Sequence, residues 1–203
     1  MSDKIYVVDY QAGNLGSVSN IIRHIGGEPV LVNRPEDLLK ADRVILPGVG
    51  AFDFGMSALT SNGMNEAVLE VAKTGIPLLG ICLGMQLLLN SSDEGKLPGL
   101  GLIKGKSNKF KDLSEGMKIP HMGWNTVRGI NSVLLKGQEK EQRFYFVHSY
   151  FVECDRKSDI AGVSTYSHDF VSMVENENVL GVQFHPEKSH KFGMALLKNF
   201  LEM

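Results

Sequence analysis

The chain has 203 residues, and 43% of them are hydrophobic, which is enough to bury one substantial core. Its 21 basic and 23 acidic residues are mixed along the sequence and give a net charge of −2, so charge offers no argument for binding nucleic acid or an anionic membrane. Residues 1–12 lack a signal-peptide pattern, and no window approaches the roughly 18 continuous apolar residues of a membrane span. We therefore expect one cytoplasmic domain covering residues 1–203.

The first half of the sequence alternates between apolar runs and helical patterns. Asn14 can cap an amphipathic helix that runs to Ile25, and a second helix at 64–75 ends at Gly75. Apolar strands separated by helices indicate a mostly parallel sheet covered on both faces, which is an α/β fold. The strands are expected at residues 4–10, 28–33, 43–50 and 76–81.

The second half is richer in strands, with little helix between them, which indicates an antiparallel, strand-rich extension of the sheet. Ser189 can cap a last helix whose apolar stripe packs on the core, although Gly193 within that helix costs roughly 1 kcal/mol relative to alanine. The strands of this half are expected at residues 117–127, 143–153, 160–167 and 178–187.

Cys82 lies where a buried apolar strand changes into a helix. Residues 80–84, Gly-Ile-Cys-Leu-Gly, form a G-x-C-x-G pattern in which small neighbours permit a tight turn that presents the nucleophile. The adjoining helix N-terminus favours a thiolate. Free cysteines are more often structural, and that interpretation suits Cys154, because Glu153 and Asp155 oppose a thiolate. Neither cysteine has a metal-ligand spacing or belongs to a disulfide framework.

A thiol nucleophile needs a base, and His185 is the best candidate among the histidines. It ends an apolar strand, and Pro186 holds the following chain extended. Residues two apart in an extended chain share a face, so Glu187 can orient His185. The pair would meet Cys82 in space at the C-terminal edge of the sheet, as triads do. His24, His168 and His190 are interpreted as ordinary residues, while the roles of His121 and His148 stay open.

With these features together, the chain resembles a class I (triad) glutamine amidotransferase domain. It resembles more narrowly the glutaminase subunits of imidazole glycerol phosphate synthase. The resemblance spans the chain and implies their three-layer α/β fold. It is carried by "DYQAGNLGSV" (9–18), "LPGVGAF" (46–52), "GICLGMQLL" (80–88), "IPHMGWN" (119–125), "YFVHSY" (145–150) and "GVQFHPEKS" (181–189).

The resemblance implies hydrolysis of the side-chain amide of L-glutamine through a thioester. Its triad falls on Cys82, His185 and Glu187. Cys82 would attack the amide carbon, His185 would pass the proton to departing ammonia and then activate water, and Glu187 would hold the imidazole. No cofactor and no metal are implied.

The same resemblance suggests how the substrate and the reaction intermediate would be held. Backbone N–H groups would bind the oxyanion, and the glycines around Val49 permit the required peptide orientation. His148 also suits an ordinary structural role in a strand. The oxyanion hole is expected at Val49, Gly50 and Leu83, and the substrate contacts at Gln86, at Glu94 for the α-ammonium group, and at His148, Ser149 and Tyr150.

A partner is also implied by the resemblance. It is a (β/α)₈-barrel cyclase subunit that forms a heterodimer with this chain and receives ammonia through an internal passage. The cyclase would make imidazole glycerol phosphate and aminoimidazole carboxamide ribotide. The expected interface and ammonia exit comprise Asn14, Trp124, Tyr145 and Lys188.

Other interpretations remain on the sequence alone. A similar glutaminase could supply ammonia to a sugar-modifying amidotransferase of surface-polysaccharide biosynthesis. A catalytically silent regulatory subunit is disfavoured by the intact triad, and an elbow-cysteine peptidase or chaperone by the distance in sequence between Cys82 and His185. A dinucleotide site at residues 48–50 is disfavoured, because the third glycine of G-x-G-x-x-G is missing and residue 53 is aspartate.

Overall fold

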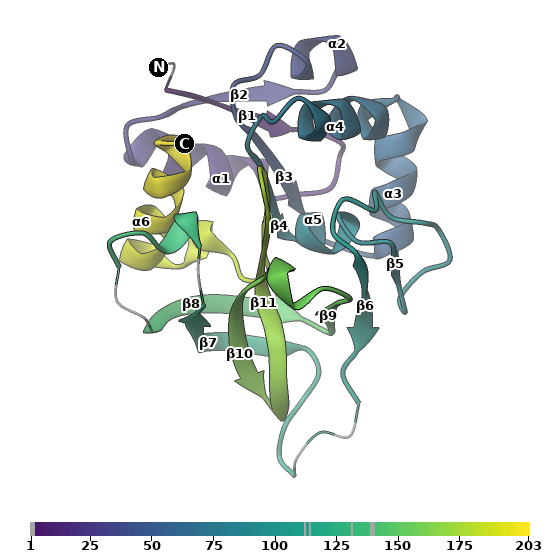
Figure 1. Cartoon of the computed structure of the whole chain (residues 1–203), viewed down its shortest axis with the longest axis vertical. Helices are drawn as coiled ribbons and strands as arrows, with labels where there is room; N and C mark the ends of the chain where they lie inside the picture. The colour runs from purple at the N-terminus through teal and green to yellow at the C-terminus, as the bar shows by residue number, and fades with distance from the viewer. Residues whose placement is uncertain (1–2, 112, 114, 131, 139–140) are drawn as a thin grey trace.

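A computed structural model describes residues 3–111, 113, 115–130, 132–138 and 141–203, and within these ranges one sheet of 12 strands runs through the molecule (Figure 1). Residues 1 and 2 of the expected domain lie outside the described residues. The upper part of the view in Figure 1 holds the helix-covered half of the sheet, and the lower part holds the strand-rich half.

The helix-covered half of the sheet is parallel, as the sequence predicts for its first four strands, but the strand expected at 178–187 in the antiparallel extension also pairs in parallel here. Its strand order is β2-β1-β3-β4-β12, and all neighbouring pairs in this run are parallel. The C-terminal ends of these strands therefore meet at one edge of the sheet. The strands are β1 (Lys4–Val8), β2 (Glu28–Val32), β3 (Val44–Gly48), β4 (Leu78–Cys82) and β12 (Val179–Val182).

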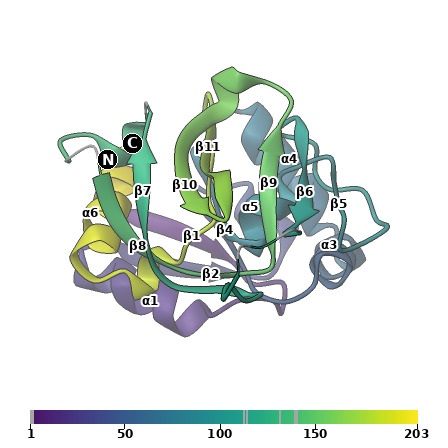
Figure 2. The same cartoon turned by 90° about the horizontal axis from the view of Figure 1, so that it is seen from below.

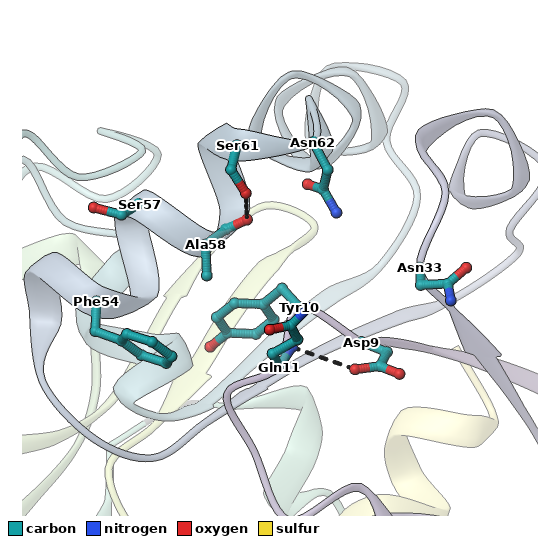
Figure 3. A pocket seen from close by; sticks show the side chains of 9 residues that line it. All are labelled: Asp9, Tyr10, Gln11, Asn33, Phe54, Ser57, Ala58, Ser61 and Asn62. Carbon is teal, nitrogen blue, oxygen red and sulfur yellow. Dashed lines mark hydrogen bonds between the residues drawn. The ribbon is translucent and has the colours of Figure 1, made fainter.

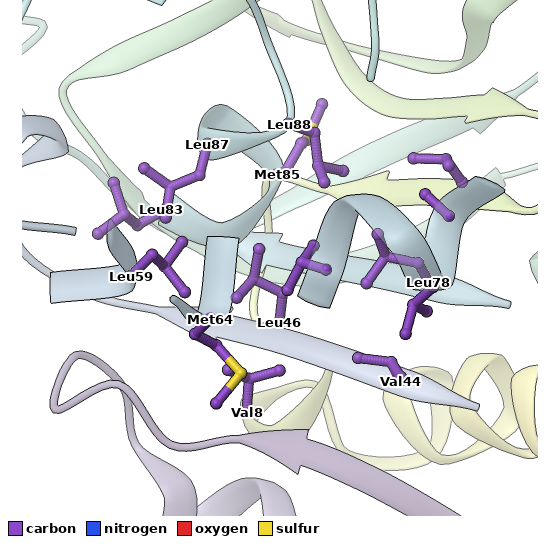
Figure 4. Packing of buried hydrophobic residues seen from close by; sticks show 14 of the residues in the cluster. Val8, Val44, Leu46, Leu59, Met64, Leu78, Leu83, Met85, Leu87 and Leu88 are labelled. Carbon is purple, nitrogen blue, oxygen red and sulfur yellow. The ribbon is translucent and has the colours of Figure 1, made fainter. Parts of the chain in front are cut away.

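Helices cover both faces of this half and give three layers. Val44 and Leu46 of β3 pack with Leu59 and Met64 on one face (Figure 4), while Ile45 points to the other face. One helical layer consists of α1 (Leu15–His24) and α6 (His190–Leu201). The other consists of α2 (Pro35–Leu38), α3 (Phe52–Ser61), α4 (Met64–Lys73) and α5 (Leu83–Leu87).

The strand-rich half extends the sheet in a largely antiparallel manner, and Figure 2 shows its strands from below. The order continues from β12 through β11, β10 and β7 to β8, while β9 pairs with β6 and β11. The elements are β5 (Ser91–Ser92), β6 (Gly105–Lys109), β7 (His121–Gly129), β8 (Glu141–His148), β9 (Tyr150–Cys154), β10 (Ile160–Tyr166) and β11 (His168–Asn176). Short 3₁₀ turns lie at η1 (Val133–Leu135), η2 (Lys157–Asp159) and η3 (Pro186–Lys188).

Three expected strands are wrong in their extent, and the first of them, expected at 117–127, begins only at His121 as β7. The strand expected at 143–153 is interrupted at Ser149, because β8 pairs with β7 whereas β9 pairs with β6. The strand expected at 178–187 ends at Val182, and Glu187 lies in the turn η3. The helices α2 and α3 and the strands β5, β6 and β11 were not predicted.

The last helix begins after Ser189 as expected, but the expected cap is wrong. Ser189 Oγ donates a hydrogen bond to the carbonyl of His185 at 2.6 Å and accepts one from the N–H of Tyr145 at 3.0 Å. The hydroxyl therefore holds β8 to the segment after β12, and makes no capping hydrogen bond to α6. Gly193 is needed for packing, since a Cβ there would lie 1.8 Å from the carbonyl oxygen of Pro186.

Glycines allow the first turn of α5 to pack directly on the sheet. A Cβ on Gly84 would lie 1.8 Å from the carbonyl oxygen of Leu46, and a Cβ on Gly80 would lie 2.7 Å from the carbonyl oxygen of Gly84. Both distances are far inside van der Waals contact. The backbone of α5 therefore touches β3 and β4 with no intervening side chain, and this contact places the turn at Cys82.

The helices of the described ranges have 12 residues or fewer. None of them is long and apolar enough to cross a bilayer.

We predict that Gly84→Ala destabilises the fold by about 1–3 kcal/mol, because the added methyl group forces the helix and β3 apart. Gly16→Ala is the matched control: this helical glycine of α1 has no atom within 4 Å of an added Cβ. That change should raise stability by up to about 1 kcal/mol. Urea unfolding followed by circular dichroism measures both, and equal effects would contradict the packing argument.

Candidate active site

A cavity of about 320 Å³ opens at the C-terminal ends of β3 and β4. It contains the predicted nucleophile, the predicted base, and all residues predicted for the oxyanion hole and the substrate. The structure thus brings together segments that are far apart in the chain. The cavity is lined by Val49, Gly50, Cys82, Leu83, Gln86, Glu94, Pro120, Val147, His148, Ser149, Tyr150 and His185.

Cys82 sits at the turn between β4 and α5 in a strained backbone conformation. Its φ is 54° and its ψ is −107°, a region that residues other than glycine rarely adopt. The tight contacts of Gly80 and Gly84 hold this conformation. Sγ lies 3.9 Å from the carbonyl oxygen of Val147, and Cys82 as a residue is 7% exposed, so its side chain faces the cavity and hardly meets bulk water.

His185 and Glu187 form a buried pair beside the thiol. Nδ1 of His185 lies 2.8 Å from Oε1 of Glu187, and both side chains are 2% exposed. The turn η3 brings the two side chains together. The sequence instead predicts an extended chain here, in which residues two apart share a face. Nε2 of His185 has no partner that satisfies hydrogen-bond geometry, although the Cys82 thiol is close enough to interact with the ring.

The electrostatic surroundings favour the protonated form of His185. Burial works against the charged imidazolium, but the contacts with Cys82 and Glu187 outweigh it and raise the pKa of His185 to about 10. Glu187 accepts from Nδ1–H, which leaves Nε2 to exchange a proton with the thiol or a reacting group. The arrangement can therefore carry a thiol nucleophile, a base and an orienting carboxylate.

Gln183 is a residue of this site that the sequence interpretation missed. Its Nε2 lies 3.7 Å from Sγ of Cys82, and its Oε1 accepts a hydrogen bond from Nε2 of Gln86 at 3.0 Å. Gln86 Nε2 also donates to the carbonyl of Tyr150 at 3.3 Å. This buried amide pair links the thiol to the segment at Ser149. Its position directly after β12 and two residues before His185 was the available signal.

His148 belongs to a chain of hydrogen bonds whose directions follow from its acceptors. Nδ1 of His148 donates to the carbonyl of Tyr150 at 2.7 Å, so Nε2 accepts from Nδ1–H of His121 at 2.9 Å. Nε2 of His121 then accepts from the Asn125 amide at 3.2 Å. Burial lowers the pKa of His148 to about 3 and that of His121 to about 4. With both nitrogens engaged, His148 is poorly suited to act as a base.

The predicted α-ammonium ligand is attached to the neighbouring helix α3. Oε2 of Glu94 accepts a hydrogen bond from the N–H of Phe52 at 2.9 Å. Val49 and Gly50 lie just before α3 on the same rim of the cavity, and Leu83 follows Cys82. Gly50 has a φ of 106°, which favours glycine at that position.

The residues predicted for the partner face do not line the cavity, but three of them form a cluster. The rings of Trp124 and Tyr145 are 6.4 Å apart, and Nζ of Lys188 lies 5.9 Å from the centre of the Tyr145 ring. Trp124 is 41% exposed and stacks on His190. Backbone contacts connect this cluster to the candidate base, since the N–H of His185 donates to the carbonyl of Tyr145 at 2.9 Å.

Asn14 has a different place in the fold. Its side-chain oxygen accepts a hydrogen bond from the N–H of Ser17 at 3.3 Å and caps α1, as the sequence predicts. The residue is exposed on the loop that follows β1.

Cys154 lies outside the cavity that contains Cys82. Burial, together with the nearby Asp159 and Asp155 carboxylates, raises the pKa of Cys154 to about 12. Its thiol is therefore protonated at neutral pH. In the described ranges, no cluster of histidine, cysteine and carboxylate side chains could hold a metal ion.

Another cavity, of about 520 Å³, lies between the end of β1 and helix α3 (Figure 3). Tyr10 contributes its ring to this cavity and donates its hydroxyl to the carbonyl of Pro47 at 2.6 Å. Burial raises the pKa of Tyr10, so the hydroxyl stays protonated. None of the predicted site residues lines this cavity, which is formed by Asp9, Tyr10, Gln11, Asn33, Phe54, Ser57, Ala58, Ser61 and Asn62.

Comparisons with known proteins agree with the motifs and the fold. The family "Glutamine amidotransferase class-I" matches residues 6–203. "Imidazole glycerol phosphate synthase subunit HisH 2" of Methanococcus maripaludis is 50% identical over 200 residues, covering 98% of each chain. "Imidazole glycerol phosphate synthase subunit HisH" of Bdellovibrio bacteriovorus is 48% identical over 204 residues, covering 98% of this chain and 100% of the relative.

The fold also resembles solved structures. PurLQS from Thermotoga maritima superposes with a TM-score of 0.76 at 21% identity, covering 100% of this chain and 99% of that chain. A structure described as a glutamine amidotransferase superposes with the same TM-score, 0.76, at 18% identity, covering 97% of each chain. These similarities confirm the α/β fold expected from the sequence.

We predict that iodoacetamide at neutral pH alkylates Cys82 and leaves Cys154 largely unmodified. Cys82 opens into the cavity beside a base, whereas the raised pKa of Cys154 keeps its thiol protonated. Peptide mass spectrometry measures the two sites separately. Cys82→Ala should abolish most labelling, and Cys154→Ala should leave it unchanged; faster labelling of Cys154 would contradict this assignment.

We also predict that the buried histidine pair makes the fold acid-sensitive. In the unfolded chain a histidine has a pKa near 6.5, but in the fold the values for His121 and His148 are about 4 and 3. At pH values between the unfolded and the folded pKa, the unfolded chain binds more protons than the folded protein. The free energy of unfolding therefore falls as pH falls from about 7 to 4.

His121→Gln tests this acid sensitivity by removing one titrating group. The slope of unfolding free energy against pH should become shallower by up to about 1.4 kcal/mol per pH unit, which corresponds to one proton. Urea unfolding at several pH values gives the slope, which is separable from any uniform loss of stability. His24→Gln, a change at an exposed histidine of α1, is the matched control, and an equal loss of slope there would contradict the assignment.

Proposed function

The chain belongs to the class-I glutamine amidotransferase family, and we propose that it is the glutamine-hydrolysing subunit of an imidazole glycerol phosphate synthase in histidine biosynthesis. Support comes from the relatives that carry this name, which match nearly the whole chain at 48–50% identity. The single structural observation that carries the proposal is the cavity in which Cys82 lies beside the buried His185–Glu187 pair. No observation favours a sugar-modifying partner.

The proposed reaction converts L-glutamine and water into L-glutamate and ammonia. Sγ of Cys82 attacks the side-chain amide carbon, and its proton passes to Nε2 of His185. His185 then protonates the departing amine, so ammonia leaves and a thioester remains. In the second half, His185 takes a proton from water, the resulting hydroxide attacks the thioester, and Cys82 is released. Glu187 orients the imidazole and stabilises its cation.

The negative charge of each tetrahedral intermediate requires nearby donors. We assign these to the backbone N–H of Leu83, next to the nucleophile, and to the segment at Val49 and Gly50 on the facing rim. Glutamine would lie along the segment His148–Ser149–Tyr150, whose carbonyl at Tyr150 is already held by Gln86 and His148. Glu94 would receive the α-ammonium group.

A cyclase subunit is the proposed partner and ammonia acceptor, and both subunits would act in the cytoplasm. The cluster of the exposed Trp124 and Lys188 with the half-buried Tyr145 is the proposed contact surface, together with Asn14. Its support is the hydrogen bond from the N–H of His185 to the carbonyl of Tyr145, which connects the cluster to the proposed base. Tryptophan and tyrosine rings at the surface are typical of interface anchors.

We predict that the chain hydrolyses glutamine faster in a one-to-one complex with the cyclase than alone, and fastest when the cyclase holds its phosphoribulosyl substrate. The physical reason is that a bound partner can select a minor orientation of the glycine-flanked Val49 peptide. Glutamate release measures all three states. Cys82→Ala should remove activity while preserving the complex.

The possible outcomes separate the parts of this proposal. Equal rates in the three states would contradict coupling to the partner. Activation by a sugar-modifying synthetase and not by the cyclase would contradict the assigned pathway. Activity retained in Cys82→Ala would contradict the assigned nucleophile.

A further inference from the structure

The loop that carries Glu94 is held against the first turn of α3 by a second carboxylate, that of Asp53. Oδ1 of Asp53 accepts hydrogen bonds from the N–H groups of Lys96 at 2.9 Å and Leu97 at 3.0 Å. Oδ2 also lies 3.0 Å from the N–H of Lys96. These hydrogen bonds lower the pKa of Asp53, so the carboxylate stays ionised when the pH falls moderately.

The close approach of the loop to Asp53 depends on a glycine. A Cβ on Gly95 would lie 1.9 Å from Oδ1 of Asp53, so no other residue could occupy this position without moving the carboxylate or the loop. Gly95 directly follows Glu94. The sequence Glu-Gly-Lys-Leu at 94–97 thus combines a cavity-lining carboxylate with a backbone shaped to bind a second one.

The two carboxylates connect the same two segments in opposite directions. Glu94 in the loop accepts from the N–H of Phe52 in α3, and Asp53 in α3 accepts from the N–H groups of Lys96 and Leu97 in the loop. Figure 1 shows α3 beside the segment that contains the loop. Hydrogen bonds to an ionised acceptor are stronger than those between neutral groups, so this reciprocal pair restricts the loop in position and orientation.

The near end of the loop is also anchored. The N–H of Glu94 donates to Oγ of Ser92 at 3.1 Å, and this hydroxyl lies 3.0 Å from Oγ of the buried Ser107. Glu94 therefore lies between a serine anchor on one side and the Asp53 anchor on the other. One oxygen of Glu94 is used by Phe52, and a carboxylate can accept at the second oxygen as well.

We propose that Asp53 is a positioning residue that holds the 94–97 loop so that Glu94 selects substrates carrying an α-ammonium group. This assignment rests on the proposed glutaminase function. Asp53 does not line the cavity; it acts through Glu94. Its position also has a second consequence: α3 begins two residues after Gly50, so the loop that recognises the substrate is attached to the segment assigned to the oxyanion.

The test compares two substrates in the complete complex with the cyclase. One is L-glutamine, and the other is glutaramate, which has the same amide and carboxylate but no α-ammonium group. Ammonia release gives kcat and KM for both. In Asp53→Ala, the KM for glutamine should rise by roughly 10-fold, as expected when hydrogen bonds to a charged group are lost, while kcat changes less.

The selectivity between the two substrates distinguishes positioning from a general structural effect. The ratio of kcat/KM for glutamine to that for glutaramate should fall by a similar factor in Asp53→Ala. Glu94→Gln should lower the same ratio, and the double variant should lower it little further, because both changes remove one recognition element. Asp53→Asn retains one acceptor oxygen and should restore part of the ratio.

Asp37→Ala is the matched control. Asp37 also lies in the first turn of a helix, α2, and bonds to Arg34 and Lys40, away from the cavity. The selectivity of Asp37→Ala for glutamine over glutaramate should equal that of the wild type. Wild-type selectivity in both Asp53→Ala and Asp53→Asn, with normal turnover, would overturn the role of Asp53 alone. Absence of glutamine hydrolysis by the wild-type complex would overturn the proposed function, and the Asp53 assignment with it.

Discussion

The direct contact between the backbone of α5 and the backbone of β3 is the constraint on which the site depends. Gly84 lies against the carbonyl of Leu46, and Gly80 lies against Gly84, so the chain after β4 must turn at Cys82 with a positive φ. A Cβ on Gly48 would lie 2.9 Å from the N–H nitrogen of Gly84. The end of β3 is therefore in contact with the elbow, and the Val49–Gly50 segment must lie on the rim facing the thiol.

A change of strand partner at Ser149 gives the cavity its second wall. β8 pairs with β7 up to His148, and β9 then pairs with β6. At the junction, some backbone N–H and C=O groups therefore make no hydrogen bond within either pair of strands. The carbonyl of Tyr150 is instead bonded by His148 and Gln86. These side chains hold the junction open in one conformation, which a continuous ladder would not provide.

Buried polar groups concentrate around this wall, and their hydrogen bonds reinforce one another. Gln86 and Gln183 join the thiol to Tyr150, while His121 and His148 join the same carbonyl to β7. A buried polar group that lacks a hydrogen-bond partner costs free energy. Each member of such a network therefore restricts its neighbours to the one arrangement in which all are bonded. In contrast, His185 keeps Nε2 without a geometrically satisfied partner and has a raised pKa, so it can hold a proton taken from the thiol and donate it later.

The sequence by itself determined the parallel half of the sheet, the helix cap at Asn14, the elbow at Cys82 and the pairing of His185 with Glu187. These features depend on local periodicity, on glycines and on residues close together in the chain. Only the tertiary structure decided the partner switch at Ser149, the contact of Gln183 with the thiol, the hydroxyl contacts of Ser189 and the carboxylate of Asp53 on the 94–97 loop. Each of these depends on which groups from distant parts of the chain the fold brings together, and no local pattern contains that information.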